Sequence, residues 1–330
     1  MVADNILCVS VERRYADIAI RRLKSRGLVN TEYRVSRLDG IILIPVVKFT
    51  GDLHDILEGV PFVITECSPP ARRLEPAVRV PSYDLIGGVA IVRSNVLGFM
   101  EESELVEALR SVHPGLKAIY VKEETVDEYR VPVLRLLWGE PVSEVVAKEY
   151  GLLFKVSLGR VYYNPRLAEE HHRIAVASRD GELIVDLFTG IGGFPVHIAS
   201  LRRSLIIAND LNPEAYRLLC WNIEANARRL KGTIIPLNTD ARRIVEYVRI
   251  EGKADRVIAN LPKSSLEFLG VYDAVLKPGG VLHLYHLTYD PDTTRVELES
   301  RLPGWRIQES RLVLEYAPRA GVYRFDLVKP

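Results

Sequence analysis

The chain has 330 residues, of which 48% are hydrophobic and 26% are charged, and its net charge is +1. This composition is that of a soluble globular protein with length for two or three domains, and the near-neutral charge by itself gives little support to a nucleic-acid partner. The sequence contains no apolar run of about 18 residues and no amino-terminal signal pattern. We therefore exclude a membrane span and expect a cytoplasmic protein.

Residue usage adds two expectations. The three cysteines, Cys8, Cys67 and Cys220, are scattered and odd in number, which suits a reducing cytosol without a disulfide framework or a zinc site. Glutamine occurs once, at Gln308, while charged residues are frequent, and this combination hints at a thermophilic source.

The first half of the chain predicts two small modules joined by a linker. Residues 1–60 contain strand-like runs around a basic helix at 15–26, which Gly27 would end. Four prolines and three arginines between Ser68 and Pro81 predict a stiff basic linker over 61–82. A second α+β module follows over 83–150.

The remainder, 151–330, alternates strands with helices. A helix from Pro213 to Arg229 follows the cap signal Asn212-Pro213, and the tail resembles a closing hairpin. Alternation with crossovers of this length predicts a Rossmann-like α/β domain, a doubly wound and mostly parallel sheet. Its strands are expected at 183–188, 204–210, 233–239, 255–260 and 279–286.

A glycine turn, Asp186-Leu-Phe-Thr-Gly-Ile-Gly-Gly-Phe194, joins the first of these strands to a helix. Glycines let the backbone approach a ligand closely, and Asp210 at the end of the next strand can accept hydrogen bonds from ribose hydroxyls. The acid before the turn repels phosphate but suits the cationic sulfonium or amino group of S-adenosylmethionine. We expect this donor rather than a dinucleotide; the alternative is a turn that only packs helix on strand.

The sequence Asn260-Leu-Pro262 stands at the end of the fourth strand, where the donor's methyl group is expected. The asparagine offers a carbonyl and an amide, and the proline would leave backbone carbonyls free to face a base edge. Many enzymes that methylate exocyclic amines of nucleobases carry Asn-Pro-Pro-aromatic here, which this chain does not match. A strand stop followed by a turn is the alternative.

The segment Arg160-Val-Tyr-Tyr-Asn-Pro-Arg-Leu-Ala-Glu-Glu-His-His-Arg173 resembles the V-Y-F-S-P-R-L-x-x-E-R signature of the archaeal and eukaryotic tRNA (guanine-37, N1) methyltransferases. The resemblance covers nearly the whole chain, including the leading module. Three positions depart from the family pattern: His171 replaces arginine, Gly193 replaces proline and Gly88 replaces aspartate. Further matches are Ser82-Tyr-Asp-Leu-Ile-Gly87, Glu128-Tyr-Arg130, Leu137-Trp-Gly139, Asp186-Leu-Phe-Thr-Gly190, Asn209-Asp-Leu-Asn-Pro213 and Asn260-Leu-Pro-Lys263.

The resemblance implies methyl transfer from S-adenosylmethionine to N1 of guanosine 37 in tRNA. Guanine N1 is a poor nucleophile while it bears its proton, so a base must remove that proton. The resemblance assigns Glu170 as this base, with a pKa raised by burial or neighbours, and Arg130 as the group that stabilises charge on the guanine 6-oxygen. Without the resemblance, Glu170 would belong to a solvated helix face and Arg130 to the surface.

The remaining site residues also come from the resemblance. Asn260, Leu261 and Pro262 would hold the Watson–Crick edge of the base, and Tyr162 or Tyr163 would stack on the flipped base or else pack in the core. Arg166 would line the pocket or contact phosphate. Asp186 would shape the methionine end of the donor site, Asp210 would bind ribose and Asp240 would meet the adenine amino group, or these acids would be helix caps. The expected donor-binding set is Asp186, Phe188, Gly190, Gly192, Phe194, Asp210, Leu211, Asp240, Ala241 and Asn260.

We expect a monomer that binds tRNA through its anticodon loop and body. The leading module would grip the tRNA body through Arg13, Arg14, Arg21, Arg22 and Lys24, unless these charges are simply solvated. Two other functions stay open: a wyosine-pathway enzyme acting on the same nucleotide, by aminocarboxypropyl transfer or by methylation of a wyosine intermediate, and a tRNA-binding protein without catalysis. The Asn260-Leu-Pro262 sequence argues against aminocarboxypropyl transfer, and the strand-end acids argue against loss of catalysis.

Overall fold

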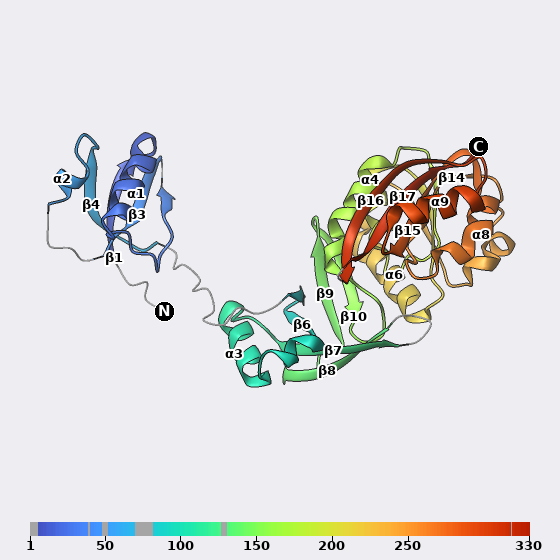
Figure 1. Ribbon diagram of the computed structural model, residues 1–330, viewed down its shortest axis with the longest axis horizontal. Helices are drawn as coiled ribbons and strands as arrows, with labels where there is room; N and C mark the ends of the chain where they lie inside the picture. The colour runs from blue at the N-terminus through green and yellow to red at the C-terminus, as the bar shows by residue number, and fades with distance from the viewer. Residues whose placement is uncertain (1–5, 39, 48–51, 70–81, 127–130, 318) are drawn as a thin grey trace. The chain divides into compact units, whose positions relative to one another are not determined.

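The computed structural model describes residues 6–38, 40–47, 52–69, 82–126, 131–317 and 319–330. These residues form two compact units that divide between Arg79 and Val80 (Figure 1). We call them unit 1 and unit 2. None of the helices in these ranges is long and apolar enough to cross a membrane.

Unit 1 is a four-stranded antiparallel sheet in the order β2-β3-β1-β4. Its core contains the fully buried side chains of Val9, Leu23 and Ile44. Residues 62–67, which the sequence assigns to the linker, instead form β4, because they pair with residues 6–11 of β1. The elements are β1 (Ile6–Glu12), η1 (Arg13–Tyr15), α1 (Ala16–Ser25), β2 (Ser36–Leu38), β3 (Ile41–Pro45), α2 (Leu53–Ile56) and β4 (Phe62–Cys67).

A disulfide bond joins Cys8 on β1 to Cys67 on β4. The two residues are 59 positions apart in the sequence, and the antiparallel pairing of β1 with β4 brings their Cα atoms to 5.9 Å. The expectation that the chain has no disulfide is therefore wrong, and Cys220 remains as a free thiol.

Unit 2 begins with a four-stranded sheet in the order β5-β6-β7-β8, covered by α3. A two-stranded hairpin of β9 and β10 follows, and its turn contains Tyr150, so the predicted boundary at 150 falls inside this hairpin. Buried residues of the hairpin, such as Phe154, belong to the core of the following domain. The elements are β5 (Tyr83–Ile86), β6 (Val89–Arg93), η2 (Ser94–Gly98), α3 (Glu102–Val112), β7 (Ala118–Val126), β8 (Val131–Gly139), β9 (Glu144–Glu149) and β10 (Leu152–Ser157).

The rest of unit 2 contains a seven-stranded sheet in the order β13-β12-β11-β14-β15-β17-β16. The strands from β11 to β15 are parallel and the final hairpin is antiparallel, which confirms the doubly wound sheet and the closing hairpin. The strands are β11 (Leu183–Asp186), β12 (Leu205–Asn209), β13 (Thr233–Leu237), β14 (Ala254–Ala259), β15 (Leu276–Thr288), β16 (Arg306–Ala317) and β17 (Ala320–Val328).

Helices cover both faces of this sheet (Figure 1). Successive residues of one strand point to opposite faces, so Ile184 packs in one hydrophobic cluster with α5 and α6, and Val185 packs in the other with α8. The helices are η3 (Pro165–Leu167), α4 (Ala168–Ala177), α5 (Gly193–Leu201), α6 (Pro213–Asn226), η4 (Ala227–Arg229), η5 (Ala241–Arg243), α7 (Ile244–Tyr247), η6 (Ser265–Phe268), α8 (Leu269–Val275) and α9 (Pro291–Arg301).

Candidate active site

The glycine turn between β11 and α5 is held by Asp186 on one side and by Asp210 on the other. Asp186 is fully buried, and its Oδ1 accepts a hydrogen bond from Phe188 N at 3.4 Å. Asp210 Oδ2 accepts from Gly190 N at 2.7 Å and its Oδ1 accepts from Asn212 N at 2.9 Å. Asp186 and Asp210, which are predicted to bind S-adenosylmethionine, therefore lie together at the carboxyl edge of the sheet.

Two glycines of the turn have backbone angles that favour glycine. Gly190 and Gly192 have φ of 56° and 97°. A Cβ at Gly192 would lie 2.6 Å from Leu219 Cδ1, so this position packs against α6. A Cβ at Gly190 would meet only Tyr162 O, at 3.9 Å, so this part of the turn faces open space.

The charge state of Asp186 fits a cationic ligand. Burial raises the pKa of Asp186 to about 7, and the charge of Asp210 adds to this rise. Among the described residues, Asp186 Oδ2 has no hydrogen-bond partner. A buried carboxylate oxygen that accepts no hydrogen bond, in a turn that is open at Gly190, matches the positively charged methionine end of S-adenosylmethionine.

Asn209 ties three strand ends together, and sequence reasoning assigned it no role. Its Nδ2 donates to Leu187 O at 3.2 Å and to Thr239 O at 3.0 Å, and its Oδ1 accepts from Thr239 N. The sequence feature that could have indicated this role is the place of Asn209 directly before Asp210, in a motif that matches the family pattern. Asn209 fixes the loops after β11, β12 and β13 relative to one another.

The other residues predicted to bind S-adenosylmethionine lie around this edge of the sheet. Asp240 caps η5 by accepting from Arg242 N at 2.9 Å, so its side chain acts at least as a cap. Leu211 is exposed, Ala241 is buried, and Phe188 packs edge-on against Phe268. Phe194 lies in the core, with its ring 4.7 Å from that of His171 and 5.5 Å from that of Tyr285.

Glu170 lies near the start of α4 and is only 5% exposed, so the alternative of a solvated helix face is wrong. Its Oε1 accepts hydrogen bonds from Tyr285 Oη at 2.8 Å and from Arg324 Nη1 at 2.7 Å. Sequence reasoning missed both partners. The available signal was an arginine and an aspartate inside the otherwise apolar tail strand, since charged residues in such a strand are rarely buried unless paired.

The two candidate stacking tyrosines differ. Tyr163 donates from its Oη to Glu149 Oε1 at 2.7 Å and packs against the core, as the packing alternative predicts. Tyr162 is 43% exposed. Arg166 donates to Asp84 Oδ1 at 3.0 Å and to Ser82 Oγ at 2.7 Å, and so links η3 to β5. Of the two tyrosines, Tyr162 is the more exposed.

The Asn260-Leu-Pro262 sequence forms a turn after β14. Leu261 O accepts from Ser264 N at 3.0 Å and Pro262 O accepts from Leu287 N at 2.8 Å. The Leu261 and Pro262 carbonyls therefore each accept one hydrogen bond within the protein, which leaves one lone pair on each oxygen. The half-buried Asn260 side chain makes no hydrogen bond within the described parts of the chain, so its amide is the group available here. Arg130 lies outside the described residues.

The two departures His171 and Gly193 contact each other. A Cβ at Gly193 would lie 2.4 Å from His171 Cε1, so the imidazole occupies space that only glycine leaves. His171 Nδ1 and His197 Nε2 both donate to Glu149 Oε2, at 2.9 and 3.0 Å. Burial alone would raise the pKa of Glu149, but the two imidazoles lower it to about 2. This buried hydrogen-bond network joins α4, α5 and β9 beside the glycine turn.

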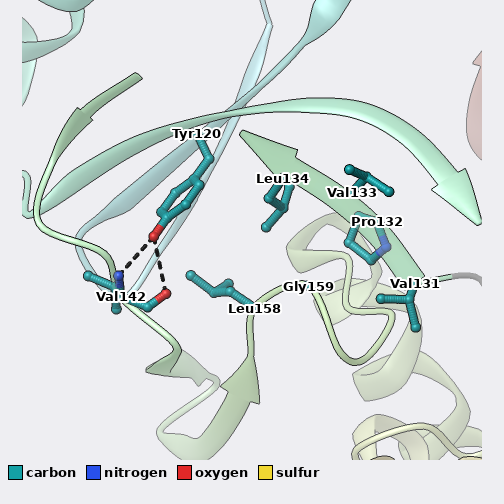
Figure 2. Close-up of a pocket in the computed structure, with 8 residues that line it drawn as sticks. All are labelled: Tyr120, Val131, Pro132, Val133, Leu134, Val142, Leu158 and Gly159. Carbon is teal, nitrogen blue, oxygen red and sulfur yellow. Dashed lines mark hydrogen bonds between the residues drawn. The ribbon is translucent and has the colours of Figure 1, made fainter. Parts of the chain in front are cut away.

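Two hollows lie in unit 2. One, with a volume of about 420 Å³, lies at the start of β8. Figure 2 shows its lining residues, among which Tyr120 Oη forms hydrogen bonds with the backbone of Val142. A larger cleft of about 920 Å³ is lined by three arginines and three tyrosines, among other residues: Arg93, Arg166, Arg319, Tyr289, Tyr316 and Tyr323. Burial, together with the charges of Arg93 and Lys263, lowers the pKa of the nearby Lys122.

Two family models match the chain. The TRM5/TYW2 methyltransferase domain matches residues 145–302, and the tRNA methyltransferase 5 N-terminal domain matches residues 8–53. The first match includes Glu170, the glycine turn and Asn260, and it ends before β16 and β17.

Individual relatives match over most of the chain. The tRNA (guanine(37)-N(1))-methyltransferase Trm5b of Pyrococcus abyssi is 32% identical over 332 residues, 95% of this chain and 96% of that protein. A solved complex of aTrm5 and tRNALeu has 27% identity and a TM-score of 0.71, covering 98% of this chain and 100% of that one. The tRNA(Phe) (4-demethylwyosine(37)-C(7)) aminocarboxypropyltransferase of Methanocaldococcus jannaschii is 31% identical over 245 residues, 72% of this chain and 93% of that protein.

Proposed function

The chain belongs to the family of the tRNA (guanine(37)-N(1))-methyltransferases Trm5b, and on this premise we propose that it transfers the methyl group of S-adenosylmethionine to N1 of guanosine 37 in tRNA. The observation that carries the proposal is the contact, through Tyr285, between Glu170 and the glycine turn. The buried signature residue Glu170 bonds Tyr285, whose ring lies 5.5 Å from that of Phe194 in the donor turn. The expected base and the expected donor site therefore adjoin.

The donor site is formed by the carboxyl ends of β11 and β12. S-adenosylmethionine supplies a methyl group on a positively charged sulfur. Asp186 would hold the cationic end, the open face at Gly190 would admit it, and Asp210 would accept hydrogen bonds from ribose while fixing the turn. Phe188, Leu211, Asp240 and Ala241 would line the nucleoside, and Asn260 would face both donor and base.

In the acceptor site, a general base and an amide would lie on the side of the methyl group that faces away from the sulfur. Glu170 would remove the N1 proton, and the unbonded Asn260 amide would hold the edge of the guanine. Tyr162 is exposed enough to stack on the flipped base. Arg130 would stabilise the charge on the 6-oxygen, as the family pattern implies.

The RNA would lie along the basic and aromatic cleft of unit 2. Neither Arg93 nor Arg319 forms an ion pair with another described residue, and Tyr289 is 78% exposed. Unpaired cations bind phosphates and exposed aromatic rings stack on bases. Unit 1 would contact the tRNA body through the basic residues of η1 and α1, five in all: Arg13, Arg14, Arg21, Arg22 and Lys24.

The test is mass spectrometry of nucleosides from unmodified tRNA incubated with the protein and S-adenosylmethionine. We expect 1-methylguanosine from tRNA with guanosine at position 37 and none when adenosine replaces it. Methylation of another base or position would contradict the proposal. Binding of tRNA and donor without any transfer would favour the non-catalytic alternative.

Aminocarboxypropyl transfer remains the second candidate, because a 31% identical relative carries that name. Two labelled donors separate the reactions on one substrate. Label in the methyl group should enter the tRNA, and label in the carboxyl group of the same donor should not. The reverse pattern would replace the proposed function by the second candidate.

The affinity for S-adenosylmethionine should rise with pH through about pH 7. Asp186 has a raised pKa of about 7, so at lower pH the free site holds a proton that a cationic ligand must displace. We expect the dissociation constant to fall by about tenfold between pH 6 and 8. Titration calorimetry measures it, and Asp186→Asn should weaken binding and remove the pH dependence. An unchanged slope in that variant would assign the effect to another group.

A further inference from the structure

We propose that Tyr285 and Arg324 are positioning residues for Glu170, which fix one carboxylate oxygen and leave the other to take the guanine N1 proton. The inference rests on the proposed function, in which Glu170 is the base. It assigns a catalytic purpose to the two C-terminal sheet partners β15 and β17, of which β17 lies beyond the matched methyltransferase domain.

The two side chains reach Glu170 from directly opposite positions on neighbouring strands. Tyr285 on β15 pairs with Arg324 on β17 in the antiparallel register. Both donate to the same atom, Glu170 Oε1, at 2.8 and 2.7 Å. The sheet therefore presents a preformed pair of donors to the start of α4.

The second carboxylate oxygen is differently placed. Glu170 Oε2 accepts no hydrogen bond from the described residues, and it forms an ion pair with Arg173 Nε at 3.4 Å. A carboxylate oxygen has two lone pairs, and the two donors occupy those of Oε1. Oε2 thus keeps its lone pairs for the proton of guanine N1.

Arg324 cannot easily turn away from Glu170, because it is buried and forms ion pairs with two further carboxylates. It is 3% exposed, its Nη2 donates to Glu309 Oε2 at 2.7 Å, and its Nε lies 2.9 Å from Asp326 Oδ1. Burial alone would lower the pKa of Arg324, but the carboxylates of Asp326 and Glu170 raise it, so the guanidinium stays charged.

Tyr285 likewise remains a donor. Burial and the charge of Glu170 raise the pKa of Tyr285 well above its ordinary value. Its hydroxyl therefore keeps its proton at any pH at which the protein works. Neither positioning group competes with Glu170 for the substrate proton.

The reaction balances with Glu170 as the only proton carrier. The N1–H bond breaks and the proton passes to Oε2, while the N1 electron pair forms a bond to the methyl carbon. The sulfur–methyl bond breaks and its electron pair stays on sulfur, which becomes a neutral thioether. Water then takes the proton from Oε2. A fixed carboxylate favours this step because misplacing a reacting group by about 1 Å can cost about a hundredfold in rate.

The test compares two buried tyrosines that each lose one hydroxyl. Tyr285→Phe removes a donor to Glu170, while the matched control Tyr272→Phe removes the hydroxyl that donates to Ser265 O at 2.9 Å. We expect Tyr285→Phe to lower kcat by about tenfold with unchanged KM for tRNA, and Tyr272→Phe to leave kcat unchanged. Arg324→Gln should lower kcat further, and Arg324→Lys should restore part of the loss.

Two more readouts separate positioning from a loss of structure. The acid limb of the kcat–pH profile should move to higher pH in Tyr285→Phe, because the ionised carboxylate loses a hydrogen bond. In a Glu170→Gln background, Tyr285→Phe should have no further effect on kcat, because it acts through Glu170.

The outcomes distinguish this inference from the proposed function. If Glu170→Gln retains the full rate, the assignment of the base is wrong. If Glu170→Gln is slow but Tyr285→Phe matches Tyr272→Phe in kcat and pH profile, the base stands and the positioning role is overturned. Equal losses in both phenylalanine variants would assign the effect to general packing and would also overturn it.

Discussion

Replacing Glu170 with glutamine should lower kcat by about two to four orders of magnitude, the usual contribution of a general base. A neutral amide cannot take the N1 proton, but its carbonyl can still accept the hydrogen bonds from Tyr285 and Arg324. The dissociation constants for S-adenosylmethionine and tRNA should therefore change by less than about threefold. Single-turnover methylation, with saturating donor and tRNA, measures the rate of the chemical step.

The neighbouring Glu169 supplies a matched control. Its side chain is 74% exposed and pairs with Arg173 on the surface, so Glu169→Gln should retain the wild-type rate. Because Glu170→Gln weakens a buried ion pair, donor binding and thermal unfolding must show that the variant is folded. A folded Glu170→Gln protein with the wild-type rate would remove Glu170 from the chemistry.

The architecture of unit 2 could be predicted because its signals are local. The parallel strand Leu205–Asn209 is a short apolar run between turn residues, and the helix Pro213–Asn226 begins at the cap residue Asn212. The approach of Asp186 to Asp210 was also predictable, because the carboxyl ends of adjacent parallel strands meet at one edge.

The partners of the site residues could not be predicted in this way. Arg324 is 154 positions from Glu170, and only the β15–β17 register determines that it faces α4 rather than the opposite side of the sheet. The contact between His171 and Gly193 is similar. Both departures were visible in the sequence, but their coupling depends on how α4 packs against α5.

The disulfide was missed for a related reason. Cysteine count and the expected compartment argued against it, while the evidence for it is the antiparallel pairing of β1 with β4. Intracellular proteins of hyperthermophiles are a known exception to the rule that cytosolic thiols stay reduced. A thermophilic composition and a disulfide are therefore compatible with each other.

Reducing the Cys8–Cys67 bond should destabilise unit 1 by about 4 kcal/mol. The bond closes a loop with a sequence separation of 59 residues. A cross-link of this span lowers the conformational entropy of the unfolded chain, and the corresponding free energy is about 4 kcal/mol. For a domain of this size the loss corresponds to a fall of roughly 15–30 °C in the midpoint of unfolding. Calorimetry of the whole chain, with and without dithiothreitol, measures the shift.

Two probes locate the effect in unit 1. All three tryptophans, Trp138, Trp221 and Trp305, belong to unit 2, so tryptophan fluorescence should report an unchanged transition while calorimetry shows an earlier one. Cys8→Ala should reproduce the reduced protein, and Cys220→Ala should not. Between the two transitions the protein should still bind S-adenosylmethionine but should lose the part of its tRNA affinity that unit 1 provides. Loss of donor binding together with the first transition would show that the units do not unfold independently and would contradict this prediction.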